Sequence, residues 1–256
     1  FTTDPIEVTT TTTTAPTTTS TTTSTTTTTA PTACDIVPFT SAANLVTEQY
    51  VDLAQRQPTT LELNTWSTAI DGGNCAADTL IAQLVPTSQT STIAKVVRLY
   101  LAYFNRSPDL GGLNYWIDQI DNHGKTIDTA SNQFAHMIEF TTTYGSLTNA
   151  QFVNLVYNNV LDRDGDPPGI AYWTGRLDSK ARTRGSVMTS FSEAQESRGK
   201  ETNKVEIVEL YLGMLLRTPT TLELTDAAAT SGTTEDVLAA AGHLIRHSTE
   251  YDNRVN

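Results

Sequence analysis

An eleven-residue pattern that occurs twice is the feature that most constrains how this chain can fold. Residues Arg106–Trp116 read Arg-Ser-Pro-Asp-Leu-Gly-Gly-Leu-Asn-Tyr-Trp, and residues Arg163–Trp173 read Arg-Asp-Gly-Asp-Pro-Pro-Gly-Ile-Ala-Tyr-Trp. A chain with such an internal repeat is expected to build one supersecondary unit several times. The shared motif residues are Arg106, Asp109, Gly112, Tyr115 and Trp116 in one copy, and Arg163, Asp166, Gly169, Tyr172 and Trp173 in the other.

Two weaker copies of the pattern flank these. Arg56 is followed by Trp66 at the same ten-residue distance, and Arg217 opens a copy that has no tryptophan. A tyrosine precedes each of the four arginines by six residues. We therefore expect a domain of residues 34–256 that is built from four repeats. Repeats 1 to 4 are expected at about residues 42–86, 92–145, 149–199 and 203–254.

The stretch before each arginine predicts an amphipathic helix. Apolar residues lie ten, six and two or three residues before the arginine, a spacing that places them on one helical face. We expect the arginine in the last turn, where a cation suits the exposed carbonyl groups, and the Pro or Gly two residues later ends the helix. Asp109 and Asp166 are predicted to cap a second helix. A third apolar stripe follows, so the predicted fold class is all-α, with about three short helices per repeat.

The motif residues can all be explained by structural roles. The arginine would cap a helix end or pair with a carboxylate, the glycine would permit close approach of a neighbour, and the Tyr-Trp pair would fill the core. A ligand-binding role for the same residues is the alternative. Their spacing is not typical of general acid–base catalysis.

The motif resembles that of a bacterial domain of unknown function whose repeats carry Arg-x-x-Asp-x-x-Gly-Leu-x-Tyr-Trp and end in a Ser-x-Glu-like segment. The resemblance covers about residues 40–254 and is most specific in the two central copies. Ser248-Thr-Glu250 fits the repeat end, whereas Glu139 and Glu196 lack the serine. Such domains occur in secreted, cell-surface and S-layer proteins, and their helical fold is similar to that of phycobilisome linker domains. The resemblance implies a fold and a location, and it supplies no catalytic residues.

The charge of the chain argues against two classes of partner. Its formal net charge of -12 disfavours binding to nucleic acids and to anionic membrane surfaces. No stretch approaches the ~20 apolar residues of a membrane span. Because the sequence begins with Phe1 rather than methionine, we expect that a leader was removed and that the protein is extracellular or lies at the cell surface.

Residues 1–33 are a separate, low-complexity arm. Twenty of them are threonine, with prolines interspersed. Such a segment cannot bury enough apolar surface to offset the entropy of ordering it, and this composition is typical of an O-glycosylated stalk. A bare, flexible spacer is the alternative. The candidate O-glycosylation sites are Thr9, Thr10, Thr11, Thr12, Thr13, Thr14, Thr17, Thr18, Thr19, Thr21, Thr22, Thr23, Thr25, Thr26, Thr27, Thr28, Thr29 and Thr32.

The chain has two cysteines, Cys34 and Cys75. In an exported protein a single pair is most simply a disulfide. This disulfide would close a loop of about 40 residues, worth roughly 3–4 kcal/mol in the chain-entropy model, and would fix the root of the arm to repeat 1. Two free buried thiols are the alternative.

Repeats 1 and 4 depart from the central two. Both contain Pro-Thr-Thr-Leu-Glu-Leu, at residues 58–63 and 219–224, in place of the Asp-x-x-Gly turn. Terminal repeats often differ because one face has no neighbour within the chain. These two segments are our candidates for faces that meet other subunits.

Three further patterns could carry a ligand or a modification. Asp162, Asp164 and Asp166 alternate as in part of a calcium loop, but the twelfth position of that loop would be Trp173 instead of glutamate. The alternative is a helix end followed by an aspartate cap. Asn105-Arg-Ser is a formal N-glycosylation sequon, and a match this short also occurs by chance.

The third pattern is a histidine pair. His243 and His247 are four residues apart on a predicted helix and could face one metal ion, with Glu250 as a third zinc ligand. A solvated or packed pair of histidines is the alternative that we prefer.

These observations favour a structural protein over an enzyme. We expect a secreted subunit of an extracellular homopolymer, either a filament or a surface layer, without a cofactor or a resident metal. Its partners would be copies of itself and covalent glycans, and the arm would link neighbouring subunits. The alternative is a cell-surface adhesin or carbohydrate-binding module on a glycosylated stalk, which exposed aromatic side chains along a groove would favour.

Overall fold

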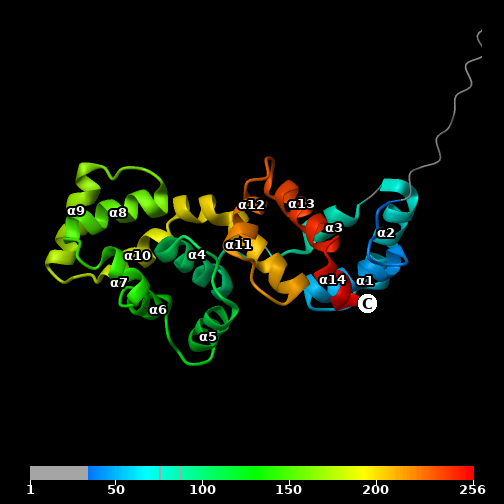
Figure 1. The fold of residues 1–256 in the computed structure, drawn as a ribbon, viewed down its shortest axis with the longest axis horizontal. Helices are drawn as coiled ribbons and strands as arrows, with labels where there is room; N and C mark the ends of the chain where they lie inside the picture. The colour runs from blue at the N-terminus through cyan, green and yellow to red at the C-terminus, as the bar shows by residue number, and fades with distance from the viewer. Residues whose placement is uncertain (1–33, 75, 87) are drawn as a thin grey trace, which may run out of the picture. The chain divides into compact units, whose positions relative to one another are not determined.

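The computed structural model describes residues 34–74, 76–86 and 88–256, and all secondary structure in these ranges is helical (Figure 1). The predicted all-α fold class is confirmed for them. The arm of residues 1–33 and Cys75 lie outside the described residues. The elements are α1 (Ala42–Ala54), α2 (Thr60–Ala69), a short π-helical segment (Ile70–Asn74), α3 (Ala77–Leu84), α4 (Thr92–Phe104), α5 (Leu110–Asp121), α6 (Ile127–Phe134), α7 (Ile138–Tyr144), α8 (Asn149–Leu161), α9 (Pro167–Asp178), α10 (Arg184–Ser192), α11 (Gln195–Leu215), α12 (Thr221–Ala228), α13 (Thr234–Arg246) and α14 (Thr249–Val255).

Most helices begin at a residue whose side chain caps the first turn. A Ser, Thr or Asp oxygen accepts a hydrogen bond from a backbone N–H there, which satisfies a group that has no partner within the helix. The predicted caps Asp109 and Asp166 are confirmed, and they accept from Gly112 and Gly169. Equivalent caps are Ser41, Thr59, Ser91, Thr126, Thr148, Thr183, Thr220, Thr233 and Ser248.

The first helix of each repeat ends at a residue in the left-handed conformation. These residues are Gln55, Asn105, Asp162 and Leu216, with φ between 49° and 57°. Each stands directly before a motif arginine, so the arginine lies beyond the helix and not in its last turn, as the sequence had led us to expect. The left-handed residue turns the chain away from the helix axis and brings the arginine side chain back along the helix surface.

All four repeats have the predicted three helices, and repeats 2 and 4 also have a short fourth one. α1, α4, α8 and α11 come first in repeats 1 to 4, followed by the second helices α2, α5, α9 and α12 and the third helices α3, α6, α10 and α13. α7 and α14 are additional short helices in repeats 2 and 4. In repeat 3 the corresponding turns are the start of α11, which runs without a break across the predicted boundary at residues 199–203.

The third helices pack in pairs, and this pairing organises the domain. α6 lies along α10, and α3 lies along α13, as Figure 1 shows for the second pair. Glycines allow both contacts to be close. A Cβ atom on Gly185 would lie 2.7 Å from backbone atoms of Asn132, and one on Gly242 would lie 2.5 Å from Cγ2 of Ile81. Repeat 2 is therefore paired with repeat 3, and repeat 1 with repeat 4.

Repeats 1 and 4 are thus neighbours, although the chain separates them by two repeats. The buried Tyr251 hydroxyl of α14 donates to Asp52 at 2.9 Å and accepts from Gln49 at 2.6 Å, both on α1. We expected terminal repeats to differ because one face has no neighbour within the chain. That expectation is wrong for the faces through which repeats 1 and 4 contact each other. The physical reason is that the central pair is inserted between them, so the two ends of the domain can meet.

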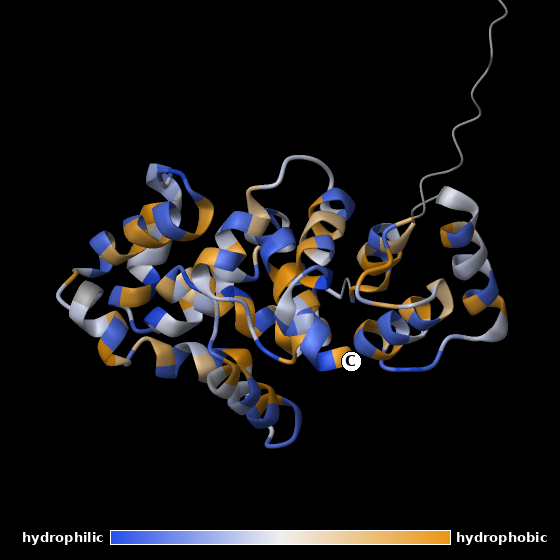
Figure 2. Cartoon of the chain, turned by 45° about the vertical axis from the view of Figure 1, so that its right-hand side comes forward, coloured by the Kyte–Doolittle hydropathy of each residue, from blue (hydrophilic) through white to orange (hydrophobic). Residues whose placement is uncertain are grey.

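Two hydrophobic clusters form the core. The larger one contains residues of α3 to α14 together with Leu53 of α1, and the smaller one lies between α1 and α3. Figure 2 shows hydrophobic and hydrophilic residues side by side on most helices, as expected for amphipathic helices that bury one face. Among the described residues, no helix combines the length and the apolar character needed to cross a membrane.

Candidate functional site

The four motif arginines have nearly identical surroundings. Each guanidinium carbon lies 5.0 to 5.2 Å from the ring centre of the tyrosine six residues earlier. Each arginine also donates from Nη1 to the carbonyl oxygen of the next residue. Stacking on an aromatic face and hydrogen bonding in the guanidinium plane together fix the orientation of the side chain.

A glutamate completes this arrangement, which we call the arginine module. In repeats 2 to 4 the glutamate stands 33 residues after the arginine, and both carboxylate oxygens accept from the guanidinium at 2.7 to 3.0 Å. The pairs are Arg106–Glu139, Arg163–Glu196 and Arg217–Glu250. The predicted pairing of the arginine with a carboxylate is therefore confirmed. Because these pairs join the turn after the first helix to the end of the repeat, they close repeats 2 to 4 on themselves.

Repeats 1 and 4 carry a second kind of carboxylate partner. Glu62 and Glu223 stand six residues after Arg56 and Arg217 and form ion pairs with them at 2.6 and 2.8 Å. Each of these glutamates also accepts from the backbone N–H of the threonine that caps its helix. Arginine hydrogen bonding, together with the cap, holds the pKa of Glu223 at about 2 and lowers the pKa of Glu62.

In the central repeats, glycine occupies the position of these glutamates. A Cβ atom on Gly112 would lie 2.2 Å from the hydroxyl oxygen of Tyr100, and one on Gly169 would lie 2.3 Å from that of Tyr157. The predicted role of the glycine in close approach is confirmed. The Asp-x-x-Gly turn therefore makes room for a tyrosine hydroxyl, whereas the Thr-x-x-Glu turn of the terminal repeats places a carboxylate on the arginine.

The two residues of each Tyr-Trp pair have different environments. Trp116 is buried and stacks edge-to-face on a phenylalanine. Trp173 is partly buried against the larger core cluster and packs at an angle to a phenylalanine. Tyr115 and Tyr172 are 51% and 53% exposed. The prediction that the whole pair fills the core is therefore wrong for the tyrosines. Consecutive residues on a helix point about 100° apart, so only one member of such a pair can face the core.

The exposed tyrosines belong to a wider feature of the second helices. α2, α5, α9 and α12 each pack mainly on the first helix of their own repeat, and each has at most two buried residues among those described. Leu61 on α2 and Leu222 on α12 are 77% and 70% exposed. They stand five residues after the motif arginine, and the tyrosines stand nine residues after it. A separation of four residues places both positions on one helical face.

Every second helix thus presents one large apolar or aromatic side chain to solvent on an equivalent face. We call these four residues, Leu61, Tyr115, Tyr172 and Leu222, the outer positions. Two of them fall in the segments 58–63 and 219–224 that the sequence marked as contact candidates. Tyr115 and Tyr172 were not predicted to be exposed, because the sequence pattern predicts that both members of the Tyr-Trp pair lie in the core.

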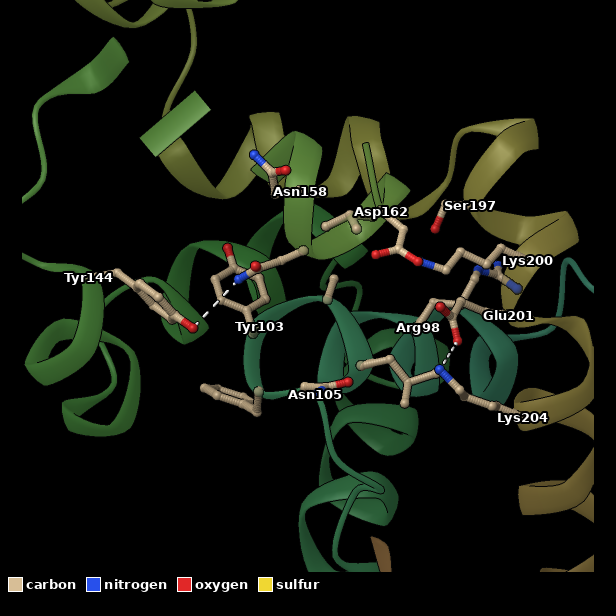
Figure 3. A pocket seen from close by; sticks show the side chains of 15 residues that line it. Arg98, Tyr103, Asn105, Tyr144, Asn158, Asp162, Ser197, Lys200, Glu201 and Lys204 are labelled. Carbon is tan, nitrogen blue, oxygen red and sulfur yellow. Dashed lines mark hydrogen bonds and ion pairs between the residues drawn. The ribbon is translucent and has the colours of Figure 1, made fainter. Parts of the chain in front are cut away.

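A polar cavity of about 450 Å³ lies between α4, α8 and α11 (Figure 3). Four of its charged side chains pair with one another: Lys200 Nζ lies 3.7 Å from Asp162 Oδ2, and Lys204 Nζ lies 2.9 Å from Glu201 Oε2. Such a lining can donate and accept hydrogen bonds to a small polar ligand. The amide side chains that line it are Asn105, Asn158 and Asn159.

The predicted calcium ligands have separate partners. Asp162 is the left-handed cap of α8 and faces Lys200 in the cavity, whereas Asp166 caps α9. Among the described residues, the group of His, Cys, Asp and Glu side chains whose ligand atoms come together does not include these aspartates. The predicted zinc ligand Glu250 pairs with Arg217 instead.

The remaining sequence candidates have less structural support. The sequon residue Asn105 is an exposed left-handed cap, but Ser107 of the same sequon is buried. Cys34 packs beside the smaller core cluster. Because Cys75 lies outside the described residues, the Cys34–Cys75 disulfide stays a prediction, and so do the O-glycans of residues 9–32.

Comparison with known proteins identifies one segment of the chain. No curated protein and no solved structure gives a significant match. Residues 131–201 match the model of a family that is described as a domain of unknown function (DUF4214). The match begins in α6, contains α7 to α10 and ends in the first turns of α11, so it includes the complete Arg163–Glu196 module. This segment is therefore similar to a family whose function is uncharacterised.

Proposed function

We propose that this protein is a secreted structural subunit of an extracellular homopolymer, either a filament or a surface layer, in which an O-glycosylated N-terminal arm links neighbouring subunits. The observation that carries this proposal is the set of outer positions. Four peripheral helices each expose one large apolar or aromatic side chain at an equivalent place. Single exposed leucines are ordinary on protein surfaces; the presence of one such side chain on the second helix of every repeat favours a repeated contact.

The outer positions suit contacts between copies because they recur within each subunit. A patch on one subunit that meets a related patch on the next makes a head-to-tail contact, and such contacts propagate unless the rotation closes a ring. Leu61 and Leu222 each directly precede a glutamate that pairs with a motif arginine, so at these two positions an apolar side chain stands beside charged groups. This resembles the usual anatomy of a protein interface.

The N-terminal arm could make a second contact with a neighbouring subunit because of its length. An extended chain of 33 residues can span up to about 110 Å, whereas α11, a 21-residue helix, is about 32 Å long. An ordered extended segment needs partners for its backbone groups. A neighbouring subunit could supply such partners, and O-glycans on the threonines would protect the remainder from proteolysis.

The resemblance noted in the sequence extends this proposal to the whole domain. We infer that residues 40–254 belong to the same kind of secreted or surface-layer domain as the matched segment 131–201 and share the fold of phycobilisome linker domains. The arginine module recurs in repeats 2 to 4, and Arg56 of repeat 1 keeps the tyrosine and carbonyl partners, so the arrangement extends beyond the matched segment and supports this inference.

Deletion of residues 1–33 tests the role of the arm. The full chain, secreted from a host that glycosylates it, should form large assemblies in negative-stain images and by light scattering. The truncated chain should keep its helical circular dichroism and lose the assemblies. Assemblies of unchanged form from the truncated chain would contradict the linking role. An intact mass equal to that of the bare sequence, measured on native material, would exclude the glycans.

The polar cavity favours a second candidate function, carbohydrate binding by a surface adhesin. Asparagine amides and paired charges are suited to sugar hydroxyl groups, and Tyr144 adds an aromatic side chain to the lining. If this alternative holds, a glycan array should identify ligands for the isolated subunit, and Asn158→Ala should abolish that binding without altering assembly.

A further inference from the structure

The segment that precedes α1 lies against the C-terminal end of α13. Arg246 of α13 donates to the carbonyl oxygen of Val37 at 2.6 Å, and His247, which caps α13, contacts Asp35 through its Nε2 atom. His243 lies one turn earlier on α13, and its ring centre is 4.2 Å from that of His247. Residues from the two ends of the domain therefore meet at one place.

Three potential metal ligands converge there. Among the described residues, Asp35, His243 and His247 are the group in which one ligand atom from each side chain lies within 4.8 Å of the others. Zinc is commonly bound by histidine nitrogen and carboxylate oxygen, at about 2.0–2.2 Å from each ligand atom. The direct contact between Asp35 and His247 would be replaced by two bonds to the ion, and both side chains are exposed enough to rotate.

A second carboxylate orients one of the histidines. Nδ1 of His243 lies 3.0 Å from Oδ2 of Asp78 on α3. With Asp78 as acceptor, Nδ1 carries the proton and Nε2 keeps its lone pair. Histidines that bind metals almost always donate their other ring N–H in this way. Helical spacing alone would not supply such a partner, so this contact is independent support for a metal site.

The charges around the three side chains also favour a cation. Arg246 is almost fully buried and contacts both carboxylates, at 3.6 Å from Asp35 and 3.0 Å from Asp78. Its single positive charge faces two negative ones. With both carboxylates ionised and the histidines neutral, these groups carry a net charge of about −1.

We propose that Asp35, His243 and His247 bind one zinc ion, with water in the remaining coordination position and Asp78 as the residue that orients His243. Two nitrogen ligands and one oxygen ligand suit zinc better than magnesium or calcium, which prefer all-oxygen sites. The bound ion would fasten the root of the arm, at residues 34–37, to the last repeat. The proposed zinc site lies within one subunit, so its test is independent of the proposed assembly.

Zinc titration of the full chain tests this site. The protein should be free of an affinity tag and treated with a chelator, and binding should be followed by isothermal titration calorimetry and by thermal unfolding. We expect one zinc per chain, a raised unfolding temperature, and no competition from a large excess of magnesium. Cobalt should bind the same site and give visible absorption bands that zinc removes.

Three variants make the test specific. His247→Gln removes a ligand at the helix cap and should abolish stoichiometric binding while keeping the fold, as checked by circular dichroism. Asp78→Asn keeps all three ligands and should weaken zinc binding by about 10–100-fold. His136→Gln, at an exposed histidine outside the group, is the matched control and should bind zinc as the parent does. Absence of saturable binding by the parent, or equal binding by His247→Gln, would overturn the proposal.

Discussion

Helices α6 and α10 meet in the central pair of repeats, and helices α3 and α13 meet in the terminal pair. The central contact uses uncharged groups: the Ser131 hydroxyl donates to the carbonyl oxygen of Gly185 at 2.7 Å, and the Thr183 hydroxyl donates to Asn132 at 2.6 Å. The terminal contact also contains charged groups. Its groups are Asp78, His243 and Arg246 between the third helices, and Asp52, Tyr251 and Arg254 between α1 and α14.

The central and terminal repeats also differ in the side chains that fill their interiors. In the central repeats, the tyrosine six residues before the arginine and the motif tryptophan both contact a phenylalanine 28 residues after the arginine, Phe134 or Phe191. The equivalent residues of the terminal repeats are Leu84 and Ile245. The central repeats therefore rely on aromatic packing, whereas the terminal ones use smaller side chains and add ion pairs. One helical arrangement can be stabilised by two kinds of chemistry.

The largest effect is expected in the aromatic group. Phe134 is fully buried and contacts four aromatic rings. Phe134→Ala should lower the free energy of unfolding by about 3–5 kcal/mol, as measured by urea denaturation. Ile245→Ala, at the equivalent place in repeat 4, removes a smaller side chain and should cost less. A larger loss for Ile245→Ala would contradict the contrast between central and terminal repeats.

The glycines at the two helix contacts provide a second comparison. Gly185→Ala places a methyl group 2.7 Å from the backbone of Asn132, which cannot move without shifting α6, and should cost about 2–3 kcal/mol. Gly242→Ala meets the side chain of Ile81, which can rotate, so its cost should be smaller. Gly175→Ala has open space around its Cβ position and should stabilise the protein by about 0.5–1 kcal/mol. Thermal unfolding of the three variants would show this order, and equal losses at Gly185 and Gly242 would contradict it.

The pH dependence of stability should distinguish the terminal contact, which contains charged groups, from the uncharged central contact. Burial raises the pKa of Asp52 to about 6, although Arg254 and the Tyr251 hydroxyl oppose this shift. The folded state thus holds the Asp52 proton more tightly than the unfolded state. The contribution of Asp52 is fully present below about pH 4 and is lost as the pH rises through 6.

Asp52→Asn should remove this dependence. Between pH 4 and 7, the parent should lose roughly 1–2 kcal/mol of stability relative to the variant. Buried Glu209 also has a raised pKa, at about 8, so the difference between the parent and the variant isolates Asp52. A difference that stays constant over this range would show that Asp52 does not titrate there.

The sequence predicted local structure better than the contacts between repeats. Apolar spacing and capping residues located the first and second helices, because both signals act within a few residues. The partner of each arginine was predicted only by type. Its position could have been found, since a glutamate follows the arginine by 33 residues in three repeats, but the meaning of that spacing depends on how the last helix folds back.

The pairing of repeats 1 and 4 had no local signal. It brings Asp35 beside His247 and Tyr251 beside Asp52, residues that are about 200 positions apart in the chain. The outer positions Tyr115 and Tyr172 escape prediction for a different reason. A Tyr-Trp pair resembles one apolar unit in the sequence, but the 100° step between helical neighbours turns its two side chains to different sides.

Sedimentation velocity of outer-position variants tests the proposed assembly most directly. The parent chain should form large species whose fraction grows with concentration. Leu61→Ser combined with Leu222→Ser should shift the protein to monomer at the same concentrations, by a factor of at least about 10 in the association constant. Leu244→Ser is the matched control, because Leu244 is 68% exposed but lies on α13, and it should assemble as the parent does. Unchanged assembly of the double variant, or equal loss in the control, would contradict an interface at the second helices.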